Sequence, residues 1–294
     1  MATVETTVDT DKRFAFGRNW RQFLDVVNDE RIAVAEASLR AMLEVETLAG
    51  ASFLDVGSGS GLFSLAAARL GAVRIHSFDY DADGVACTQE LKRRYKRGMD
   101  AWTIERGSVL DPAYLASLGR FDVVYSWGVL HHTGAMWRAL EGVAPLVEPG
   151  GRLFLAIYND QGWISKAWTR VKRLYISGRP GRMLVTAVFV PYFAGLNLAS
   201  DLRHLRNPLA HYRNYKQQRG MSVVHDWWDW LGGYPFEVAT PGEVVRFYEA
   251  RRFSLVKLKT CGNSLGCNEF VFRSTSSAFA GEPKRVEKRV QPLR

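Results

Sequence analysis

The sequence predicts an α/β protein in which strands and helices alternate around an open sheet. A short apolar run, Ser52 to Val56, is followed by glycines at alternate positions, Gly57, Gly59 and Gly61, and then by an apolar helical pattern that stops at Gly71. Strand, glycine turn and helix form the opening of a βαβ nucleotide-binding unit, in which the missing side chains let a ligand lie against the backbone. Further apolar strand patterns alternate with helical ones downstream, as this fold class requires.

Acidic residues near the ends of the first two strands narrow the choice of ligand. Asp55 lies near the end of the first strand, and the second strand, Ile75–Phe78, runs into Asp79. An acid at this second position is placed to accept hydrogen bonds from both hydroxyls of a ribose. A dinucleotide fingerprint would have Gly or Ala at position 62, and Leu62 stands there instead. We therefore expect a nucleoside-containing ligand other than a dinucleotide.

Two later motifs point to a family. The fourth predicted strand, Phe121–Trp127, is followed by Gly128-Val-Leu-His-His-Thr133, and the turn Glu148-Pro-Gly-Gly151 precedes the fifth, Arg152–Tyr158. With these motifs the chain resembles the class I S-adenosylmethionine-dependent methyltransferases. The stretch after the fourth strand resembles the ubiquinone- and menaquinone-type enzymes, which typically carry a histidine at the position of His132.

The resemblance implies a Rossmann-like, seven-stranded methyltransferase sheet in which strand seven lies antiparallel between strands five and six. It implies S-adenosylmethionine as cofactor and S-adenosylhomocysteine as product. The third predicted strand is Trp102–Arg106. In the family, the loop after this strand holds the adenine, and Asp111 in that loop is a further candidate for contacting it. The alternative is that this segment is an ordinary strand–helix loop. The residues at cofactor-binding positions are Asp55, Gly57, Ser58, Gly59, Gly61, Asp79, Tyr80, Gly107, Ser108, Val109 and Trp127.

The composition suggests how the rest of the chain is organised. The segment Phe14–Trp20 is expected to lead into a helix that continues to about Leu48. Thr240 and Pro241 are expected to begin a helix after the insertion, and two strands should follow. The expected parts are a disordered N-terminus at 1–12, a helical cap at 13–50, the cofactor-binding core at 51–158, a large insertion between strands five and six at 159–239, the end of the core sheet at 240–274 and a flexible tail at 275–294.

The insertion carries the net charge of the protein, which is +9. Between Asn159 and Gly220 there are eleven Lys and Arg against two acids, and the remainder of the chain is neutral. The uncharged stretch Met183–Ala199, with Pro191 in its middle, is shorter than the roughly 20 residues of a membrane span. A buried helical pair or a lid is therefore expected, while arginines on both sides leave an interfacial membrane contact open.

Aromatic residues on the substrate side suggest a flat acceptor. A tryptophan-rich stretch between Arg219 and Glu237 is either a structural plug that anchors the insertion or the wall of an aromatic pocket. N-terminal helices in this superfamily often close over the cofactor, which adds two aromatic residues from the cap. The candidate substrate-contacting residues are Phe16, Trp20, Trp163, Trp227, Trp228 and Tyr234.

The chemistry requires alignment of the acceptor with an electrophilic methyl group and, where the acceptor loses a proton, a nearby base. The candidates are His132, His131, Tyr158 and His225, although a histidine here can also serve only to position the substrate. Catechol-type enzymes hold a divalent metal with acids after strand four. Ser126–Val129 contains no acid, so no metal is expected.

The acceptor is predicted to be a small, aromatic or otherwise flat molecule methylated on oxygen, nitrogen or an electron-rich carbon such as that of an indole. Three alternatives remain open: tRNA modification, a quinone or lipid acceptor at a membrane surface, and a non-catalytic cofactor-binding protein. Nucleic acid is not the expected partner, because the basic segment is interrupted by a long apolar run and shows no RNA-binding module. Three cysteines and the polar, acidic N-terminus without a secretory pattern predict a cytoplasmic protein.

Overall fold

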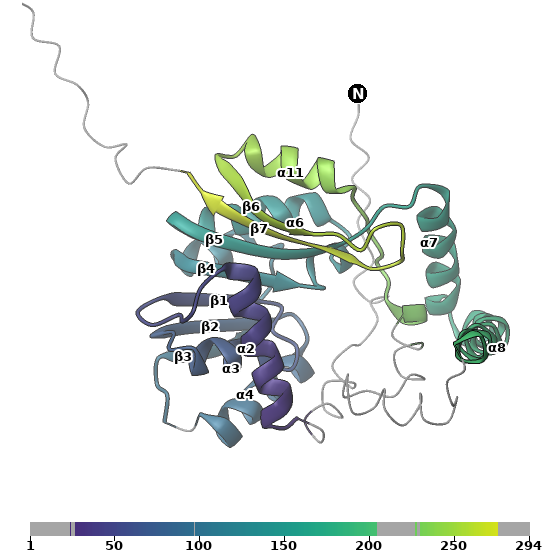
Figure 1. The fold of residues 1–294 in the computed structure, drawn as a ribbon, viewed down its shortest axis with the longest axis horizontal. Helices are drawn as coiled ribbons and strands as arrows, with labels where there is room; N and C mark the ends of the chain where they lie inside the picture. Colours follow the sequence, from purple (N-terminus) through teal and green to yellow (C-terminus); the bar gives the residue numbers. More distant parts are fainter. Residues whose placement is uncertain (1–23, 25–26, 97, 205–226, 228–229, 276–294) are drawn as a thin grey trace, which may run out of the picture.

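The computed structural model describes residues 24, 27–96, 98–204, 227 and 230–275 (Figure 1). Its strands form one seven-stranded sheet in the order β3-β2-β1-β4-β5-β7-β6. Neighbouring strands from β3 to β5 are parallel, whereas β7 is antiparallel to both β5 and β6. The predicted seven-stranded sheet and the place of its seventh strand are confirmed. The strands are β1 (Ser52–Val56), β2 (Arg74–Asp79), β3 (Trp102–Arg106), β4 (Phe121–Trp127), β5 (Val147–Tyr158), β6 (Phe253–Lys259) and β7 (Cys267–Ser274).

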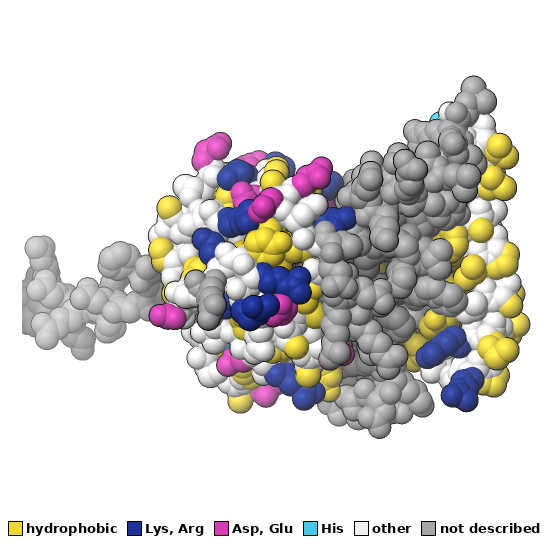
Figure 2. All heavy atoms as spheres, turned by 90° about the horizontal axis from the view of Figure 1, so that it is seen from below, with side chains coloured by type: hydrophobic (Ala, Val, Ile, Leu, Met, Phe, Trp, Pro, Cys, Tyr) yellow, Lys and Arg dark blue, Asp and Glu magenta, His cyan; other side chains and the backbone are white. Residues whose placement is uncertain are grey.

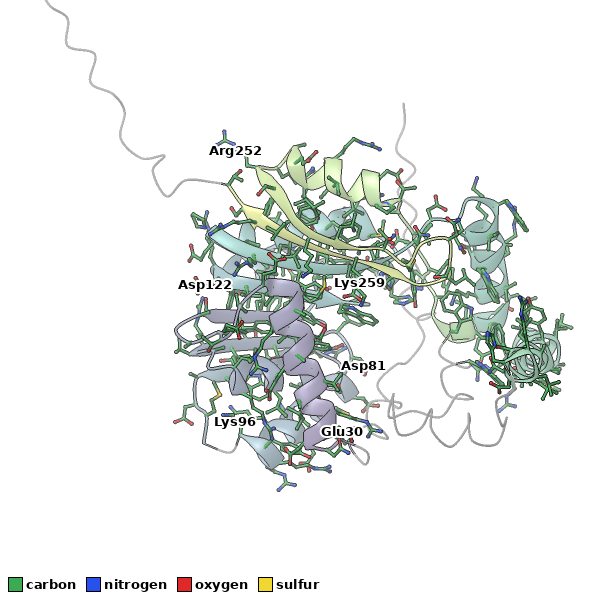
Figure 3. The ribbon with its side chains drawn as sticks, in the orientation of Figure 1. Glu30, Asp81, Lys96, Asp122, Arg252 and Lys259 are labelled. Carbon is green, nitrogen blue, oxygen red and sulfur yellow. The ribbon has the colours of Figure 1, made fainter. Side chains whose placement is uncertain are left out.

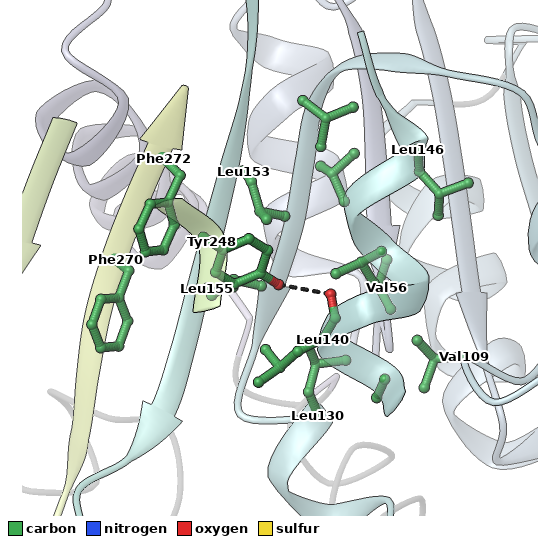
Figure 4. Close-up of a cluster of buried hydrophobic side chains, with 14 of the residues drawn as sticks. Val56, Val109, Leu130, Leu140, Leu146, Leu153, Leu155, Tyr248, Phe270 and Phe272 are labelled. Atoms are coloured by element: carbon green, nitrogen blue, oxygen red, sulfur yellow. Dashed lines mark hydrogen bonds between the residues drawn. The ribbon is translucent and has the colours of Figure 1, made fainter. Parts of the chain in front are cut away.

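Helices cover both faces of the sheet (Figure 1). Side chains of α2, α3 and α4 form one apolar cluster with the sheet, and those of α5, α6 and α11 form another on the opposite face. In the second cluster, Tyr248 on α11 donates its hydroxyl to the carbonyl of Leu140 on α6 at 2.9 Å (Figure 4). The helices are α2 (Asp29–Leu43), α3 (Leu62–Arg69), α4 (Ala82–Tyr95), α5 (Pro112–Ser117), α6 (Met136–Val143) and α11 (Pro241–Glu249), with 3₁₀ turns η2 (Leu130–His132) and η3 (Ala144–Leu146).

The ends of several elements follow from local chemistry. Thr240 caps α11 in a reciprocal pair with Glu243, and Pro241 occupies the first turn, as predicted. The helix expected to reach Leu48 ends a turn earlier, at Leu43, because Glu44 adopts a left-handed conformation with φ 53°. That helix begins at Asp29, and Asn28 is its N-cap residue. Most of the predicted N-terminal helical segment that precedes Asn28 lies outside the described residues.

Up to Arg203 the insertion contains the helices α7 (Trp163–Ile176) and α8 (Arg179–Arg203), which pack against each other. The uncharged stretch Met183–Ala199 lies within the one helix α8 and is largely exposed, so the prediction that it forms a buried helical pair is wrong, whereas the alternative of a lid stays a prediction. Helix α8 has 25 residues, continues through Pro191 and exposes most of one side. Helix α8 is longer than the uncharged stretch Met183–Ala199, because residues on both sides of that stretch belong to the same helix.

The parallel strands all point their carboxyl ends toward one edge of the sheet. Asp81, just beyond β2, lies near that edge, whereas Asp122, near the start of β4, lies at the opposite edge (Figure 3). Helix α7 stands beyond the carboxyl edge (Figure 1). A ligand site in an open parallel sheet is expected at this edge.

Candidate active site

The turn after β1 presents backbone rather than side chains. Gly57, Gly59 and Gly61 have φ values of 79°, 52° and 76°, which favour glycine. A Cβ on Gly57 would lie 2.5 Å from the methyl groups of Val129, and one on Gly61 would lie 2.7 Å from Cγ2 of Thr88. The turn therefore has no room for side chains at these two positions, and it leaves its backbone open to a ligand at the start of α3.

Asp79 ends β2 beside this turn. Its carboxylate accepts hydrogen bonds from the backbone N–H of Gly59 at 2.8 Å and of Asp81 at 2.9 Å. Burial raises the pKa of Asp79, and these backbone hydrogen bonds oppose the rise by stabilising the ionised form. The glycine turn and the acid are thus held as one rigid unit, with the carboxylate positioned for a pair of hydroxyl groups.

Asp55 is buried on β1 beneath the same turn. Ser64 on α3 donates its hydroxyl to the Asp55 carboxylate at 2.5 Å. Burial raises the pKa of Asp55 to about 7; the Ser64 hydrogen bond opposes that rise, whereas the nearby Asp79 adds to it. Two acids at one end of the site favour a ligand that carries positive charge.

One cavity of about 930 Å³ runs from the glycine turn toward the insertion. This volume suits a ligand of the size of a nucleoside with a second molecule beside it. Asp111 and Gly61, both predicted to contact the cofactor, do not line it: Asp111 caps α5, and Gly61 begins α3 behind the turn. The predicted cofactor residues that line the cavity are Asp55, Gly57, Ser58, Gly59, Asp79, Tyr80, Gly107, Ser108, Val109 and Trp127.

His132, Tyr158, Trp230 and Tyr234 line the other part of the cavity. The ring of Tyr158 lies 5.5 Å from that of His132 and 5.7 Å from that of Trp230, both edge-on. His132 Nδ1 lies 2.6 Å from the carbonyl oxygen of Pro235. A carbonyl only accepts hydrogen bonds, so Nδ1 carries the proton and Nε2 of the neutral ring is the atom able to accept one.

Burial lowers the pKa of His132 to about 4, and the nearby Lys172 contributes to the decrease, whereas the bond to Pro235 opposes it. The ring is therefore neutral near pH 7. A base with so low a pKa is better suited to accepting a hydrogen bond than to holding a full proton. Nε2 is therefore able to accept a hydrogen bond from an O–H or N–H group in the cavity.

His131 does not line the cavity, in contrast to the prediction that groups it with His132. Its side chain is fully buried behind the cavity wall, with its ring 4.0 Å from that of Tyr158. Burial and the neighbouring His132 and Lys172 hold the pKa of His131 well below its ordinary value, and a backbone contact with Ala156 opposes this. His131 packs against Tyr158 and supports the wall as a neutral side chain.

Lys172 on α7 was not predicted from the sequence. Its side chain is fully buried, its ammonium donates to the carbonyl of Trp230, and it lies 4.0 Å from the centre of the Trp230 ring. Burial lowers the pKa of Lys172 to about 7. Lysine normally lies at the surface, so composition alone treats it as part of a basic face; its spacing of four residues from Trp168 was the available signal.

The predicted substrate residues divide into three groups. Tyr234 lines the cavity, whereas Trp163 is 77% exposed and Trp227 packs against Phe193 with ring centroids 5.8 Å apart, so neither lines it. Phe16, Trp20, Trp228 and the candidate base His225 lie outside the described residues. Cavity-lining residues missed by the sequence reasoning include Phe63, Tyr125, Trp230, Leu265, Gly266 and Cys267.

The residues present fit S-adenosylmethionine. Asp79 suits its ribose hydroxyls, the glycine turn accommodates close backbone contact, and the acids Asp55 and Asp79 complement a cation. Within the described residues there is no group of three or more His, Cys, Asp or Glu side chains that would hold a metal ion.

Comparisons with known proteins show what the core is similar to. Residues 54–153 match the family described as methyltransferase domain. The ribosomal protein L11 methyltransferase of Methylococcus capsulatus (strain Bath) is 33% identical over 114 residues, covering 39% of this chain and 36% of that protein. The ubiquinone biosynthesis O-methyltransferase of Brucella melitensis biotype 2 is 27% identical over 171 residues, covering 53% of this chain and 66% of that protein.

Among solved structures, an O-methyltransferase family protein from Burkholderia thailandensis shares the fold. Its TM-score is 0.53 at 12% identity, covering 89% of this chain and 62% of that one. The fold, the turn with its acids and the family match identify the core as a class I S-adenosylmethionine-dependent methyltransferase domain. The chain spans between 36% and 66% of the length of the two curated relatives described above.

Proposed function

We propose that the protein transfers the methyl group of S-adenosylmethionine to a small, flat and aromatic acceptor. The observation that carries this proposal is the single cavity that joins the Asp79 turn to the wall of His132, Tyr158, Trp230 and Tyr234. The cofactor supplies an electrophilic methyl group, so the chain's task is alignment and exclusion of water. Aromatic walls hold a flat ring in one orientation and exclude water from it.

Three side chains would position the acceptor. The Tyr158 and Trp230 rings would contact its face or edge, and His132 Nε2 would accept a hydrogen bond from its O–H or N–H group. Accepting that bond raises electron density on the attacking atom and orients it toward the methyl group. The O–H or N–H proton would leave to solvent by way of His132, and the buried Lys172 ammonium, close behind Trp230, would stabilise the ionised acceptor that then attacks the methyl group.

A turnover screen tests the proposal. Protein and S-adenosylmethionine are incubated with separate pools of phenols, indoles and quinols, and with bulk tRNA, and S-adenosylhomocysteine is measured. We expect turnover with one of the small-molecule pools and none for Asp79→Ala. Turnover with tRNA alone would contradict the small-molecule proposal, and cofactor binding without turnover in any pool would favour a non-catalytic role.

Two substitutions at His132 distinguish the roles of its two ring nitrogen atoms. Gln places an amide near the position of Nε2, whereas Asn places one near Nδ1, where it retains only the contact with Pro235. We expect His132→Asn to lower kcat by at least about a hundredfold and His132→Gln to retain more activity. The control is His204→Gln at the exposed end of α8. Equal activity in all three variants would remove His132 from the mechanism.

A further inference from the structure

Helix α8 has an exposed side that is entirely uncharged over most of its length. Between Arg182 and Asp201 the helix contains no charged residue, and by length and composition it is apolar enough to cross a membrane. Only 6% of its most apolar window is buried. Figure 2 shows apolar side chains along this helix, at the right edge of the molecule. The large apolar side chains of α8 that are at least 48% exposed are Met183, Leu184, Val188, Tyr192, Leu196, Leu198 and Leu202.

The opposite side of α8 is packed and connects to the cavity. Phe189 and Phe193 lie 5.2 and 6.1 Å from the ring of Trp168 on α7. Trp168 in turn lies 5.6 Å from Trp230, which lines the cavity. The exposed apolar side is therefore separated from the acceptor end of the cavity by this aromatic layer.

Within α7 and α8 the exposed charged side chains are all of one sign. From Trp163 to Arg203 the one acid, Asp201, is 3% exposed. The exposed basic residues of α7 and α8 are Lys166, Arg170, Arg173, Arg179, Arg182 and Arg203. Apolar surface with a cationic border and no exposed acid is complementary to an anionic lipid bilayer.

We propose that α8 docks onto an anionic membrane surface, lying in the plane of the lipid headgroups with its apolar side in the acyl boundary. A transmembrane arrangement would carry α7 with it, because Trp168 packs on α8, and α7 exposes Lys166, Arg170 and Arg173. A second copy of the chain is disfavoured as the occupant, because pairing two such faces would bring two sets of cations together. The proposal concerns the partner of α8 and is independent of the acceptor.

Vesicle co-sedimentation tests it with the full chain. We expect binding to vesicles of phosphatidylcholine and phosphatidylglycerol, little binding to phosphatidylcholine alone, and loss of binding as salt rises. Leu184→Glu with Val188→Glu should weaken binding by about tenfold or more, because both side chains lie on the apolar side. The matched control is Val34→Glu, which is 66% exposed on α2. Equal binding by the double variant and the control would overturn the proposal.

The basic border is tested separately. The double variant Arg179→Glu with Arg203→Glu should bind anionic vesicles more weakly, by at least about fivefold for each residue changed. The control Arg138→Glu on α6 should have little effect on vesicle binding. Hydrogen exchange of the unaltered protein provides a test that needs no variant: vesicles should slow exchange in α8 and leave α2 unchanged. Failure of the unaltered protein to bind anionic vesicles, or a dimer that Leu184→Glu with Val188→Glu dissociates, would overturn the proposal.

Discussion

The two ends of the cavity bury ionisable groups of opposite sign. At the cofactor end, Asp55 and Asp79 lie beneath and beside the glycine turn, and burial raises the pKa of both. At the acceptor end, burial lowers the pKa of Lys172 and His132. The cavity is therefore polarised: its acidic end suits a cationic cofactor, and its aromatic end, backed by a lysine, suits the ionised form of the acceptor proposed above.

The largest effect is expected from removing the acid that defines the cofactor end. Asp79→Ala removes a carboxylate that fits two ribose hydroxyls and that fixes the Gly59 backbone. We expect S-adenosylmethionine to bind roughly a thousandfold more weakly, since each hydrogen bond to a charged group contributes about 1.5–3 kcal/mol. Isothermal titration calorimetry measures this, with Asp100→Ala, an exposed turn residue, as control. A change under tenfold would show that Asp79 does not hold the ribose.

The cofactor end was largely predictable from the sequence because its signals are local. Strands β1, β3 and β4 begin and end at the predicted residues, since buried parallel strands appear as apolar runs between turns. The acceptor end was not predictable in the same way. Trp230 lies in the tryptophan-rich stretch, yet its place in the cavity depends on packing against Tyr158 and Trp168 from two other elements.

Lys172 illustrates why the remainder of the site escaped prediction. It lies in a basic run, where lysine is ordinarily solvated, and only tertiary packing shows that this one is enclosed by Trp230 and Phe236. The length of α8 is hard to predict for a related reason: the absence of charge marks only Met183–Ala199, although the helix extends from Arg179 to Arg203.

Lys172 also provides a test of the acceptor end. Its pKa is lowered from 10.5 to about 7 in the folded protein, so between these values the unfolded chain binds more protons and stability rises with pH. Relative to Lys172→Met, the unaltered protein should gain about 2 kcal/mol of unfolding free energy between about pH 7 and about pH 9. Denaturant unfolding at several pH values measures the difference, and Lys166→Met, an exposed lysine on α7, is the control. Parallel pH profiles for all three proteins would contradict a buried Lys172.

A pair of glycines tests the packing of the turn against Val129. Gly57 and Gly119 have similar φ values, 79° and 72°, but an added Cβ meets Val129 at 2.5 Å only at Gly57, while Gly119 has nothing within 4 Å. Both alanine variants carry the same backbone strain, so their difference isolates the contact. We expect Gly57→Ala to be less stable than Gly119→Ala by between about 1 and 2 kcal/mol in thermal or denaturant unfolding. Equal losses would show that the turn has room for a side chain.

The smallest effect concerns Asp55, and it tests whether the acidic end responds to the charge of the cofactor. Its pKa of about 7 leaves it largely protonated below that pH, and a cationic ligand binds better when the carboxylate is ionised. Affinity for S-adenosylmethionine should therefore rise about tenfold from about pH 6 to about pH 8 and then level off. Asp55→Asn should flatten this profile, and S-adenosylhomocysteine, which lacks the sulfonium charge, should show a shallower rise with the unaltered protein. Equal pH profiles for the two ligands would mean that Asp55 does not respond to the sulfonium, and the polarity of the cavity would then rest on Asp79 alone.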